Sequence, residues 1–547
     1  MRLTSLAHYQ RDGKRLATIV SVLVRYGLAD RLVNVEPDFV KRWLKHEDLE
    51  ELAKLSLGDR IRRACEELGP TFIKIGQILS TRPDVVPQEI ATALESLQTQ
   101  TPGSSSDAIV AIVEEELGGS VPELFAHFET TPLASASIGQ VHRAHLADGT
   151  KVAVKVQHPG IEEKVNVDLN ILIHLARFFE EHDPELQIYG PLALAEESKR
   201  TLQRELDFRR ELRNQQAFER SFEGDANVII PATYPDLSSR RVLTMQLLEG
   251  YSIRETERLL SDGHDPARLA LTGAHAFLKM VFQDRLFHAD PHPGNVFVLD
   301  DGRIGLLDFG MVGRLDEDLL DDLLDLLIGF VGQDVSGISR AVQHLGSIPA
   351  DCDQTQLRRD LAELQSELSH VPFDQLEATV LLDQFTSLIR NHRIRLPATI
   401  SMLIKVLAML DGTSRQLDRE FSLTELLGPY CEDAIRKRWS PRVQARRAYE
   451  TGRDWTRFLV GLPRVLDNIT QRLSRQALTV DLEHKGLEAT VDRLVSGILC
   501  AAMLLGGSIM WALGAPPTLF GISVLGLVAT LLALLHGIRL LSKLGPH

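Results

Sequence analysis

Three oxygen-bearing side chains stand at the ends of two short apolar runs within residues 287–310. Asp290 and Asn295 precede the run Val-Phe-Val-Leu, and Asp308 follows Arg-Ile-Gly-Leu-Leu, with Asp-Asp-Gly between the runs. Two apolar runs around a tight turn predict a β-hairpin, which would bring the three side chains together at one end. Because carboxylate and amide oxygens are hard ligands, the segment predicts a Mg²⁺ ion held against a polyphosphate.

A lysine earlier in the chain is a candidate for contacting phosphate. Residues 132–156 predict strand, loop, strand, turn and strand, and the last strand carries Val-Ala-Val-Lys155. A lysine on an edge strand is usually solvated. Here, however, the preceding loop consists of small residues, so a phosphate chain could approach its backbone N–H groups closely. These small residues are Ala134, Ser135, Ala136, Ser137 and Gly139.

The two segments have complementary chemistry if the fold brings them together. Lys155 would neutralise charge on the α- and β-phosphates, and Asn295 and Asp308 would hold Mg²⁺. Asp290 would accept a proton from the attacking hydroxyl or water, or orient it. This set of side chains predicts phosphoryl transfer from a nucleotide.

The order and spacing of these residues look like the protein-kinase fold. Four residues separate Asp290 from Asn295, as in the kinase catalytic loop, and Asp308 begins an Asp-Phe-Gly motif one hairpin later. Ala289 replaces the arginine that often precedes the catalytic aspartate, so we do not expect control by phosphorylation of an activation loop. Each motif alone is weak, but four in this order over about 150 residues are specific.

Acidic residues on a predicted helix offer a partner for Lys155. Helices are expected at about 161–183 and 191–222, and the second contains Glu205, Asp207 and Glu211. Asp207 and Glu211 are four residues apart and share a face. One reading is intrahelical ion pairs with the neighbouring arginines. The other is that one acid pairs with Lys155, as in the kinase fold.

The strand predicted at 241–250 ends in Glu249 and a glycine. A two-lobed kinase fold places its adenine-contacting hinge at this point, so Glu249 is a candidate contact for the nucleotide base. Residues 251–286 and 315–430 show apolar helical spacing apart from the central hairpin, and we expect them to form the core of the larger lobe.

Residues 1 to about 125 are expected to be helical. Gly69 can end one helix and Pro70 can begin the next. In that second helix Lys74, Gln77 and Ser80 or Thr81 fall near one face. Taken alone, this pattern favours a solvated helix face. A further helix near the N-terminus is amphipathic, with Leu16, Ile19, Val20 and Leu23 on one face, and we find no secretory signal.

Length and composition narrow the class of protein. A chain of 547 residues is too long for one ordinary core, so two or three folded units are expected. The net charge of −15 excludes a general nucleic-acid-binding surface. The four cysteines lie far apart, which argues against a zinc site or a disulfide framework and is compatible with a reducing compartment.

The C-terminal part of the chain predicts a membrane anchor. Residues 435–475 are basic and aromatic, as in a segment that lies on anionic lipid. No Asp, Glu, Lys or Arg occurs at 494–538, and Pro516 and Pro517 divide this run. The two stretches, 494–513 and 518–538, are each close to the roughly 20 residues that span a bilayer. Basic residues flank both outer ends, so these ends should face the cytoplasm. A buried core hairpin is the alternative. Ala502 and Gly506 have the spacing of a helix contact in the membrane, which suggests a homodimer.

Together the motifs are similar to those of the UbiB/AarF family of atypical kinase-like proteins, which includes the coenzyme Q chaperone-type kinases. The resemblance covers about residues 60 to 310 by motif and the C-terminal hairpin by architecture. The matching segments are Lys74-Ile75-Gly76-Gln77, the alanine-rich loop Ala134-Ser135-Ala136-Ser137-Ile138-Gly139-Gln140, Val-Ala-Val-Lys155, Glu205-Leu206-Asp207, His288-Ala289-Asp290 through Asn295, and Asp308-Phe309-Gly310. The two serines in the alanine-rich loop depart from the pattern and leave the nucleotide preference open.

The resemblance implies that the helix with Lys74 and Gln77 folds over the active site and meets Glu205 and Asp207, blocking the groove where a kinase takes its peptide. It also implies that Glu211 is the partner of Lys155. The family supports prenyl-quinone biosynthesis, through ATP binding or hydrolysis at the membrane. A bacterial member of this kind would lie in the cell inner membrane, with its catalytic part in the cytoplasm.

We therefore expect an α+β, two-lobed kinase-like fold with a helical N-terminal extension and a C-terminal transmembrane hairpin. The expected divisions are 1–125, 126–250, 251–430, 431–493 and 494–538. The expected activity is that of a Mg²⁺- and ATP-dependent kinase or ATPase that handles lipid-soluble quinone precursors. Anionic lipids and quinone-biosynthesis enzymes are expected as partners, and nucleic acid is not. A true protein kinase and a non-catalytic nucleotide-binding scaffold are the alternatives.

Overall fold

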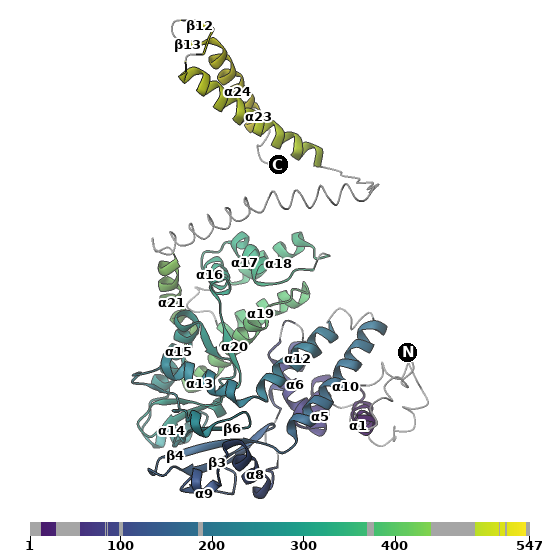
Figure 1. The fold of residues 1–547 in the computed structure, drawn as a ribbon, viewed down its shortest axis with the longest axis vertical. Helices are drawn as coiled ribbons and strands as arrows, with labels where there is room; N and C mark the ends of the chain where they lie inside the picture. Colours follow the sequence, from purple (N-terminus) through teal and green to yellow (C-terminus); the bar gives the residue numbers. More distant parts are fainter. Residues whose placement is uncertain are drawn as a thin grey trace. The chain divides into compact units, whose positions relative to one another are not determined.

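The computed structural model describes residues 12–28, 55–97 without 83 and 85, 102–183, 190–349, 351–368, 377–438, 487–513, 515–519 and 522–542. The chain divides into two compact units, Met1–Gln444 and Ala445–His547, which are described separately. The first unit combines a small antiparallel sheet, a hairpin-containing second sheet and many helices (Figure 1). The mixed helix and sheet content agrees with the α+β prediction.

The smaller lobe is built on a five-stranded antiparallel sheet of order β1-β3-β4-β6, with β2 paired to β3. Its strands are β1 (His127–Phe128), β2 (Ala134–Ser135), β3 (Gly139–His145), β4 (Lys151–Gln157) and β6 (Val242–Gln246). On β4, Val152, Val154 and Val156 pack against α8 (Ser106–Leu117). Because side chains alternate along a strand, Ala153 and Lys155 point to the opposite face.

Three helices lie on the Lys155 side of this lobe. The sequence predicted the first of them and treated the other two as a single helix. α10 (Ile161–His182) agrees with the expectation. The single helix expected at 191–222 is wrong, because the structure has α12 (Pro191–Glu205) and α13 (Phe208–Ser221). The break falls at Leu206 and Asp207, whose side chain accepts a hydrogen bond from Arg209 N and caps α13. Aspartate is a favoured N-cap residue, and this preference overrides continuous helical spacing.

The N-terminal extension is helical in its described residues, as predicted. Its helices are α1 (Asp12–Arg25), α5 (Leu57–Leu68), α6 (Pro70–Ser80), α7 (Gln88–Glu95), α8 and the short α9 (Val121–Leu124). Gly69, with φ of +94°, ends α5, and Pro70 begins α6. α6 packs on α5, α7, α10 and α12 (Figure 1). This packing places Lys74 of α6 next to α12, on the Lys155 side of the smaller lobe.

The predicted central hairpin is present in the larger lobe. β9 (Val296–Leu299) pairs antiparallel with β10 (Ile304–Leu306), and Gly302 adopts φ of +80° in the turn. The second sheet has the order β5-β10-β9-β7, with β5 (Val228–Ile229) and β7 (Gly250–Ser252) at its edges. Separately, β8 (Leu286–His288) pairs with β11 (Val312–Arg314). The β8–β11 pair therefore joins the segment before the hairpin to the segment after it.

Helices surround this hairpin and form one large apolar core with it. They are α14 (Thr256–Ser261), α15 (Pro266–Lys279), a π-helical turn (Met280–Asp284), α16 (Glu317–Val331), α17 (Val335–Leu345), α18 (Gln354–Leu368), α19 (Ala378–Asn391), α20 (Ala398–Leu417) and α21 (Leu423–Arg438). The helical expectation for 251–286 needs correction, because that stretch begins in β7 and ends in β8.

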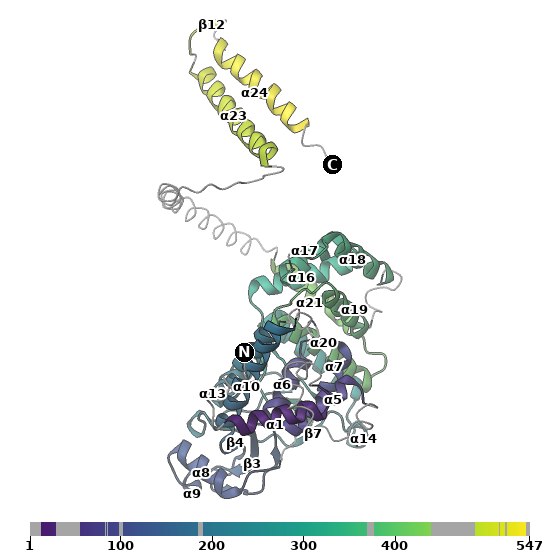
Figure 2. The same cartoon turned by 90° about the vertical axis from the view of Figure 1, so that its right-hand side faces the viewer.

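The second unit contains two helices that lie side by side, α23 (Leu487–Ala512) and α24 (Val524–Ser542) (Figure 2). Among the described residues, Val495–Ala512 is the helix long and apolar enough to cross a membrane, and Val524–His536 is a shorter apolar helix. The predicted second span is not confirmed, and Thr518–Leu519 and Ile522–Ser523 form a small β-hairpin before α24 begins at Val524. The basic segment predicted at 435–475 lies almost entirely outside the described residues.

Small residues do bring the two helices together, but not the pair that the spacing suggested. A Cβ atom at Gly507 would lie 3.0 Å from Gly526 O, so close approach of α23 and α24 depends on glycine there. A Cβ atom at Gly506 would meet nothing within 4 Å. Gly506 therefore takes no part in the contact between these helices, and its role in a homodimer stays a prediction.

Candidate active site

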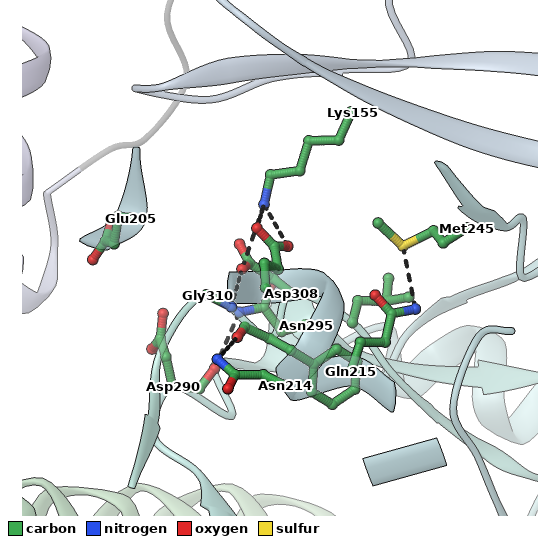
Figure 3. Close-up of polar contacts among 12 residues, drawn as sticks. Lys155, Glu205, Asn214, Gln215, Met245, Asp290, Asn295, Asp308 and Gly310 are labelled. Atoms are coloured by element: carbon green, nitrogen blue, oxygen red, sulfur yellow. Dashed lines mark hydrogen bonds and ion pairs between the residues drawn. The ribbon is translucent and has the colours of Figure 1, made fainter. Parts of the chain in front are cut away.

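One ion pair joins the smaller lobe to helix α13. Lys155 Nζ lies 2.8 and 2.9 Å from the two carboxylate oxygens of Glu211 and 3.6 Å from Asp308 Oδ1 (Figure 3). The Lys155 and Glu211 side chains are 16% and 6% exposed, whereas Asp308 is 49% exposed. Lys155 thus bridges a buried carboxylate and one that remains open to a ligand.

In this cluster the lysine ammonium groups and the carboxylates stabilise each other's charged forms. Burial alone would lower the pKa of Lys155, but the carboxylates of Asp308 and Glu211 raise it above its ordinary value. Packing around Asp308 opposes its charge, but the ammonium groups of Lys155 and Lys74 hold its pKa well below the usual range. The lysines are therefore positive and Asp308 is negative at neutral pH, as a phosphate contact and a cation ligand must be.

Asp308 sits in a sharp, unusual turn of the backbone. Its φ is +57°, in the left-handed region that residues other than glycine rarely adopt. The Gly310 N–H donates to Asp308 Oδ1 at 3.1 Å. His288 Nε2 donates to the carbonyl of Leu307 at 2.9 Å, just before this turn. The carboxylate direction is consequently set by the backbone on which it stands.

Asp290 and Asn295 belong to one compact loop at the open end of the hairpin. Asn295 ends a turn of 3₁₀ helix, and its Nδ2 donates to Asp290 O at 3.1 Å. This leaves Asn295 Oδ1, which has no hydrogen-bond partner in the described part of the chain. The Leu307 N–H donates to Asn295 O at 2.9 Å, so Asn295 lies beside the strand that leads into Asp308. The loop thus presents an amide oxygen next to the Asp308 carboxylate (Figure 3).

These oxygens are suited to binding Mg²⁺. They do not form a transition-metal site in which protein side chains supply all the ligands. The described residues contain no cluster of three or more His, Cys, Asp or Glu side chains able to hold a metal. Mg²⁺ commonly uses one or two protein oxygens and fills its other positions with phosphates and water. Asp308 and Asn295 Oδ1 match that requirement.

Helix α6 contributes a second cation to the same site. Lys74 Nζ lies 2.9 Å from Glu205 Oε2, at the last residue of α12. Burial opposes the charge of Lys74, but Glu205, Asp308 and Asp290 raise its pKa above the ordinary value. The other oxygen of Glu205 is buried without a hydrogen-bond partner among the described residues. Gln77, one turn after Lys74 on α6, is half-buried.

Two predicted site residues face elsewhere. The expectation that Asp207 meets the Lys74 helix is wrong, because its carboxylate caps α13 and binds Arg209 at 2.8 and 2.9 Å. Glu249 is 63% exposed and pairs with Lys151 at 2.7 Å. The strand register explains this position, because β6 runs antiparallel to β4 and its end reaches the beginning of β4 at Lys151.

Part of the predicted alanine-rich loop is a β-strand, and the rest forms a tight turn. Ala134 and Ser135 form β2, and the Ala136 N–H closes a tight turn onto Gly139 O at 2.8 Å. Gly139 must remain glycine, because a Cβ atom there would lie 2.4 Å from the Val156 carbonyl oxygen. Ser137 is buried, and its hydroxyl has no hydrogen-bond partner in the described chain.

Two residues of that motif are structural. Ile138 is buried in the core cluster that also contains Ile75 of α6. The side chain of Gln140 is fully buried, and its Oε1 accepts from Ser104 N at 2.7 Å while Nε2 contacts the His142 ring at 2.8 Å. Burial and internal hydrogen bonds occupy these two side chains, so only the backbone at Ile138 and Gln140 is left to approach a nucleotide, and that contact stays a prediction.

Sequence reasoning missed Asn214. This residue follows Glu211 by one turn of α13, and its Nδ2 donates to Phe309 O at 3.1 Å. The spacing of three residues from Glu211 was available in the sequence. However, the partner of Asn214 is a backbone carbonyl 95 residues away, which no local pattern can indicate.

The site combines a lysine, a helix carboxylate and an Asp-Phe-Gly aspartate on a frame of two sheets. Three models of known domains match the chain. The ABC1 atypical kinase-like domain matches residues 96–342, the UbiB helical domain matches 361–422, and the ABC1/UbiB kinase-like C-terminal domain matches 480–544. The "Probable protein kinase UbiB" of Azotobacter vinelandii is 32% identical over 527 residues, which cover 92% of this chain and 94% of that protein. The chain belongs to the UbiB family.

Two further proteins with similarity to this chain are a curated relative and a solved structure. An uncharacterized protein in the hydrogenase 1 5′ region of Clostridium pasteurianum is 30% identical over 490 residues, or 88% of this chain and 92% of that protein. A solved structure of the Rv3197–erythromycin complex from Mycobacterium tuberculosis is similar over 63% of this chain and 87% of its own, at 25% identity and a TM-score of 0.45. The matched domain models place a kinase-like domain before a helical domain and a C-terminal domain in this UbiB-family chain.

Proposed function

We propose that this UbiB-family chain is a membrane-anchored atypical kinase or ATPase that binds Mg-ATP and supports ubiquinone or related prenyl-quinone biosynthesis. The observation that carries the proposal is the position of Lys155 between Glu211 and Asp308, with Asn295 beside the strand leading to Asp308. This arrangement combines one held cation with two oxygen donors, as Mg-nucleotide binding requires.

Each side chain of the site has a proposed role. Glu211 would hold the Lys155 ammonium group where it can contact the α- and β-phosphates. Asp308 and Asn295 Oδ1 would hold Mg²⁺, which supplies charge neutralisation across the phosphate oxygens when bound. Asp290 would orient the attacking hydroxyl or water and take its proton. The backbone around the turn at Ala136–Gly139, rather than the side chains of Ile138 and Gln140, would approach the phosphates.

The position of Lys74 favours a small nucleophile over a protein substrate. Helix α6 belongs to the N-terminal extension, and it places an ammonium group where Asp290 and Asp308 both act on it. A peptide substrate would have to displace this helix and break the Lys74–Glu205 ion pair. Hydrolysis of ATP, or transfer to a small lipid-soluble quinone precursor, needs no such displacement.

The membrane part of the proposal has separate support. The helix Val495–Ala512 is long and apolar enough to span a bilayer. We propose inner-membrane localisation with the kinase-like unit in the cytoplasm, anionic lipids and prenyl-quinone precursors as ligands, and quinone-biosynthesis enzymes as partners.

The test is ATP turnover by the purified full chain with Mg²⁺ and anionic liposomes, with and without phenolic quinone-precursor analogues. Asp308→Asn should lower turnover by at least about 100-fold, because it removes the carboxylate that would hold Mg²⁺ against the phosphates. Asp301→Asn is the matched control, since Asp301 pairs with Arg303 in the exposed hairpin turn. Equal turnover by wild type and Asp308→Asn would refute the proposal, and labelled phosphate on a protein substrate would favour a protein kinase instead.

A further inference from the structure

The left-handed conformation of Asp308 must be maintained by its surroundings. A non-glycine residue with positive φ is strained and persists only where neighbouring contacts determine it. At φ of +57°, a change of this one torsion would swing the Asp308 carboxylate away from Lys155. The question is therefore which groups hold the peptide units on either side of Asp308.

One side-chain donor holds a peptide unit on each side of Asp308. Before Asp308, the Leu307 carbonyl accepts from His288 Nε2 at 2.9 Å. After Asp308, the unit between Phe309 and Gly310 is held, because the Phe309 carbonyl accepts from Asn214 Nδ2 at 3.1 Å and the Gly310 N–H of the same unit donates to Asp308 Oδ1. Figure 3 shows Asn214 reaching this turn from α13, next to Asn295 and Asp308. The Phe309 ring is fully buried, so the residue between Asp308 and Gly310 is held by both its side chain and its carbonyl.

Asn214 and Glu211 stand three residues apart on α13 and therefore face the same way. Glu211 holds Lys155, and Asn214 holds the turn that carries Asp308. A single rigid helix thus sets the positions of the cation for the phosphates and the anion for the metal. A displacement of α13 would move both groups together.

We propose that Asn214 is a positioning residue for Asp308, which acts through the Phe309 carbonyl to keep the carboxylate in its cation-binding direction. This inference rests on the proposed function for its ligand, Mg²⁺ with a nucleotide. Its structural content, that Asn214 holds the turn, does not depend on any ligand. A purely stabilising hydrogen bond would affect unfolding but would leave the Mg²⁺ dependence of nucleotide binding unchanged.

The sharpest variant is Asn214→Asp, which preserves size but replaces the amide donor with a carboxylate oxygen that faces the Phe309 carbonyl. Asn214→Ala removes the donor without adding a charge and serves as the second variant if the first folds poorly. The matched control is Asn166→Ala on α10, because Asn166 makes one exposed hydrogen bond to Gln203, 3.2 Å long and remote from the site.

The first measurement is hydrogen exchange of the full chain in detergent micelles without ligand. The Gly310 N–H donates to Asp308 Oδ1, so its protection reports the direction of the carboxylate. We expect faster exchange in the peptide covering 307–314 in both Asn214 variants, and wild-type exchange there in Asn166→Ala. Wild-type exchange in both Asn214 variants would overturn the inference.

The second measurement is binding of a fluorescent ATP analogue as Mg²⁺ is titrated, together with binding in EDTA. Loss of one positioning hydrogen bond should raise the half-saturating Mg²⁺ concentration by about 5- to 10-fold, with metal-free binding unchanged. A parallel loss of metal-free and metal-dependent binding would overturn the positioning role. Absence of Mg²⁺-dependent binding in the wild type would refute the proposed function, and hydrogen exchange alone would then decide the role of Asn214.

Discussion

Replacing Lys155 with methionine should reveal how strongly the Glu211 carboxylate depends on its partner. Methionine has a similar length and no charge, so the change removes the ammonium group and leaves Glu211 in place. The Glu211 side chain is 6% exposed and makes both of its close polar contacts with Lys155. The variant therefore contains a buried carboxylate without its cation.

The size of the effect follows from two bounds. Removing one partner of a buried pair costs about 3–5 kcal/mol. Glu211 can instead take up a proton. At about pH 7.5, with an unfolded pKa of about 4.3, this neutralisation costs about 4 kcal/mol, at 1.36 kcal/mol for each pH unit. We expect Lys155→Met to lose about 3–4 kcal/mol of unfolding free energy at this pH.

The loss should depend on pH in a direction that identifies Glu211. Burial raises the pKa of Glu211 in the folded protein, and removing Lys155 raises it further. The folded variant then binds more protons than the unfolded chain, so its stability falls as pH rises from the unfolded pKa towards the folded one. The deficit relative to wild type should shrink as the pH is lowered from about 7.5 to about 5.

Urea unfolding followed by far-UV circular dichroism measures these changes. Lys151→Met is the control, because it breaks an ion pair whose side chains are 48% and 63% exposed, and we expect no measurable change. Adding Glu211→Gln to Lys155→Met should abolish the pH dependence and recover part of the stability. A pH-independent deficit in Lys155→Met, or one equal to that of Lys151→Met, would refute the assignment of a buried charge pair.

Three further predictions concern residues around the site. Lys74→Ala should change the ATP turnover rate without lowering the melting temperature by more than a few degrees, and an unchanged rate would remove Lys74 from the active site. Asp207→Ala should cost about 1 kcal/mol in urea unfolding, because it removes the N-cap of α13, and should keep wild-type Mg²⁺ dependence; loss of that dependence would show a direct role. Burial raises the pKa of the Cys65 thiol to about 12, so iodoacetamide at about pH 8 should label it only after unfolding; rapid labelling of the folded chain would contradict the packing.

Local patterns predicted the elements around the site well, for identifiable reasons. Two apolar runs separated by a turn that contains Gly302 predict the hairpin at 296–306, and Gly302 adopts a positive φ in the structure. The boundary between α5 and α6 follows from Gly69 and Pro70, because both residues limit the backbone directly. In such cases the cause of the structure lies within a few residues and can be read from the sequence.

Some predicted site residues make contacts whose causes lie outside their own segments. Glu249 faces Lys151 because the register of β6 on β4 brings the linker past that end of the sheet. Ile138 and Gln140 sit in an alanine-rich motif, yet their side chains fill a core and a buried hydrogen-bond network. Motif membership located the segment but could not show which of its side chains are buried.

Charge balance is the property of this site that only the assembled structure shows. Lys74 and Lys155 come from α6 and β4, whereas the four carboxylates of Glu205, Glu211, Asp290 and Asp308 come from two helices and two loops. Four carboxylates against two ammonium groups leave two negative charges, which a divalent cation would neutralise before a nucleotide adds its own. Because the N-terminal extension supplies one of the two lysines, the kinase-like domain alone would lack that ammonium group. The extension therefore contributes to the electrostatics of the site.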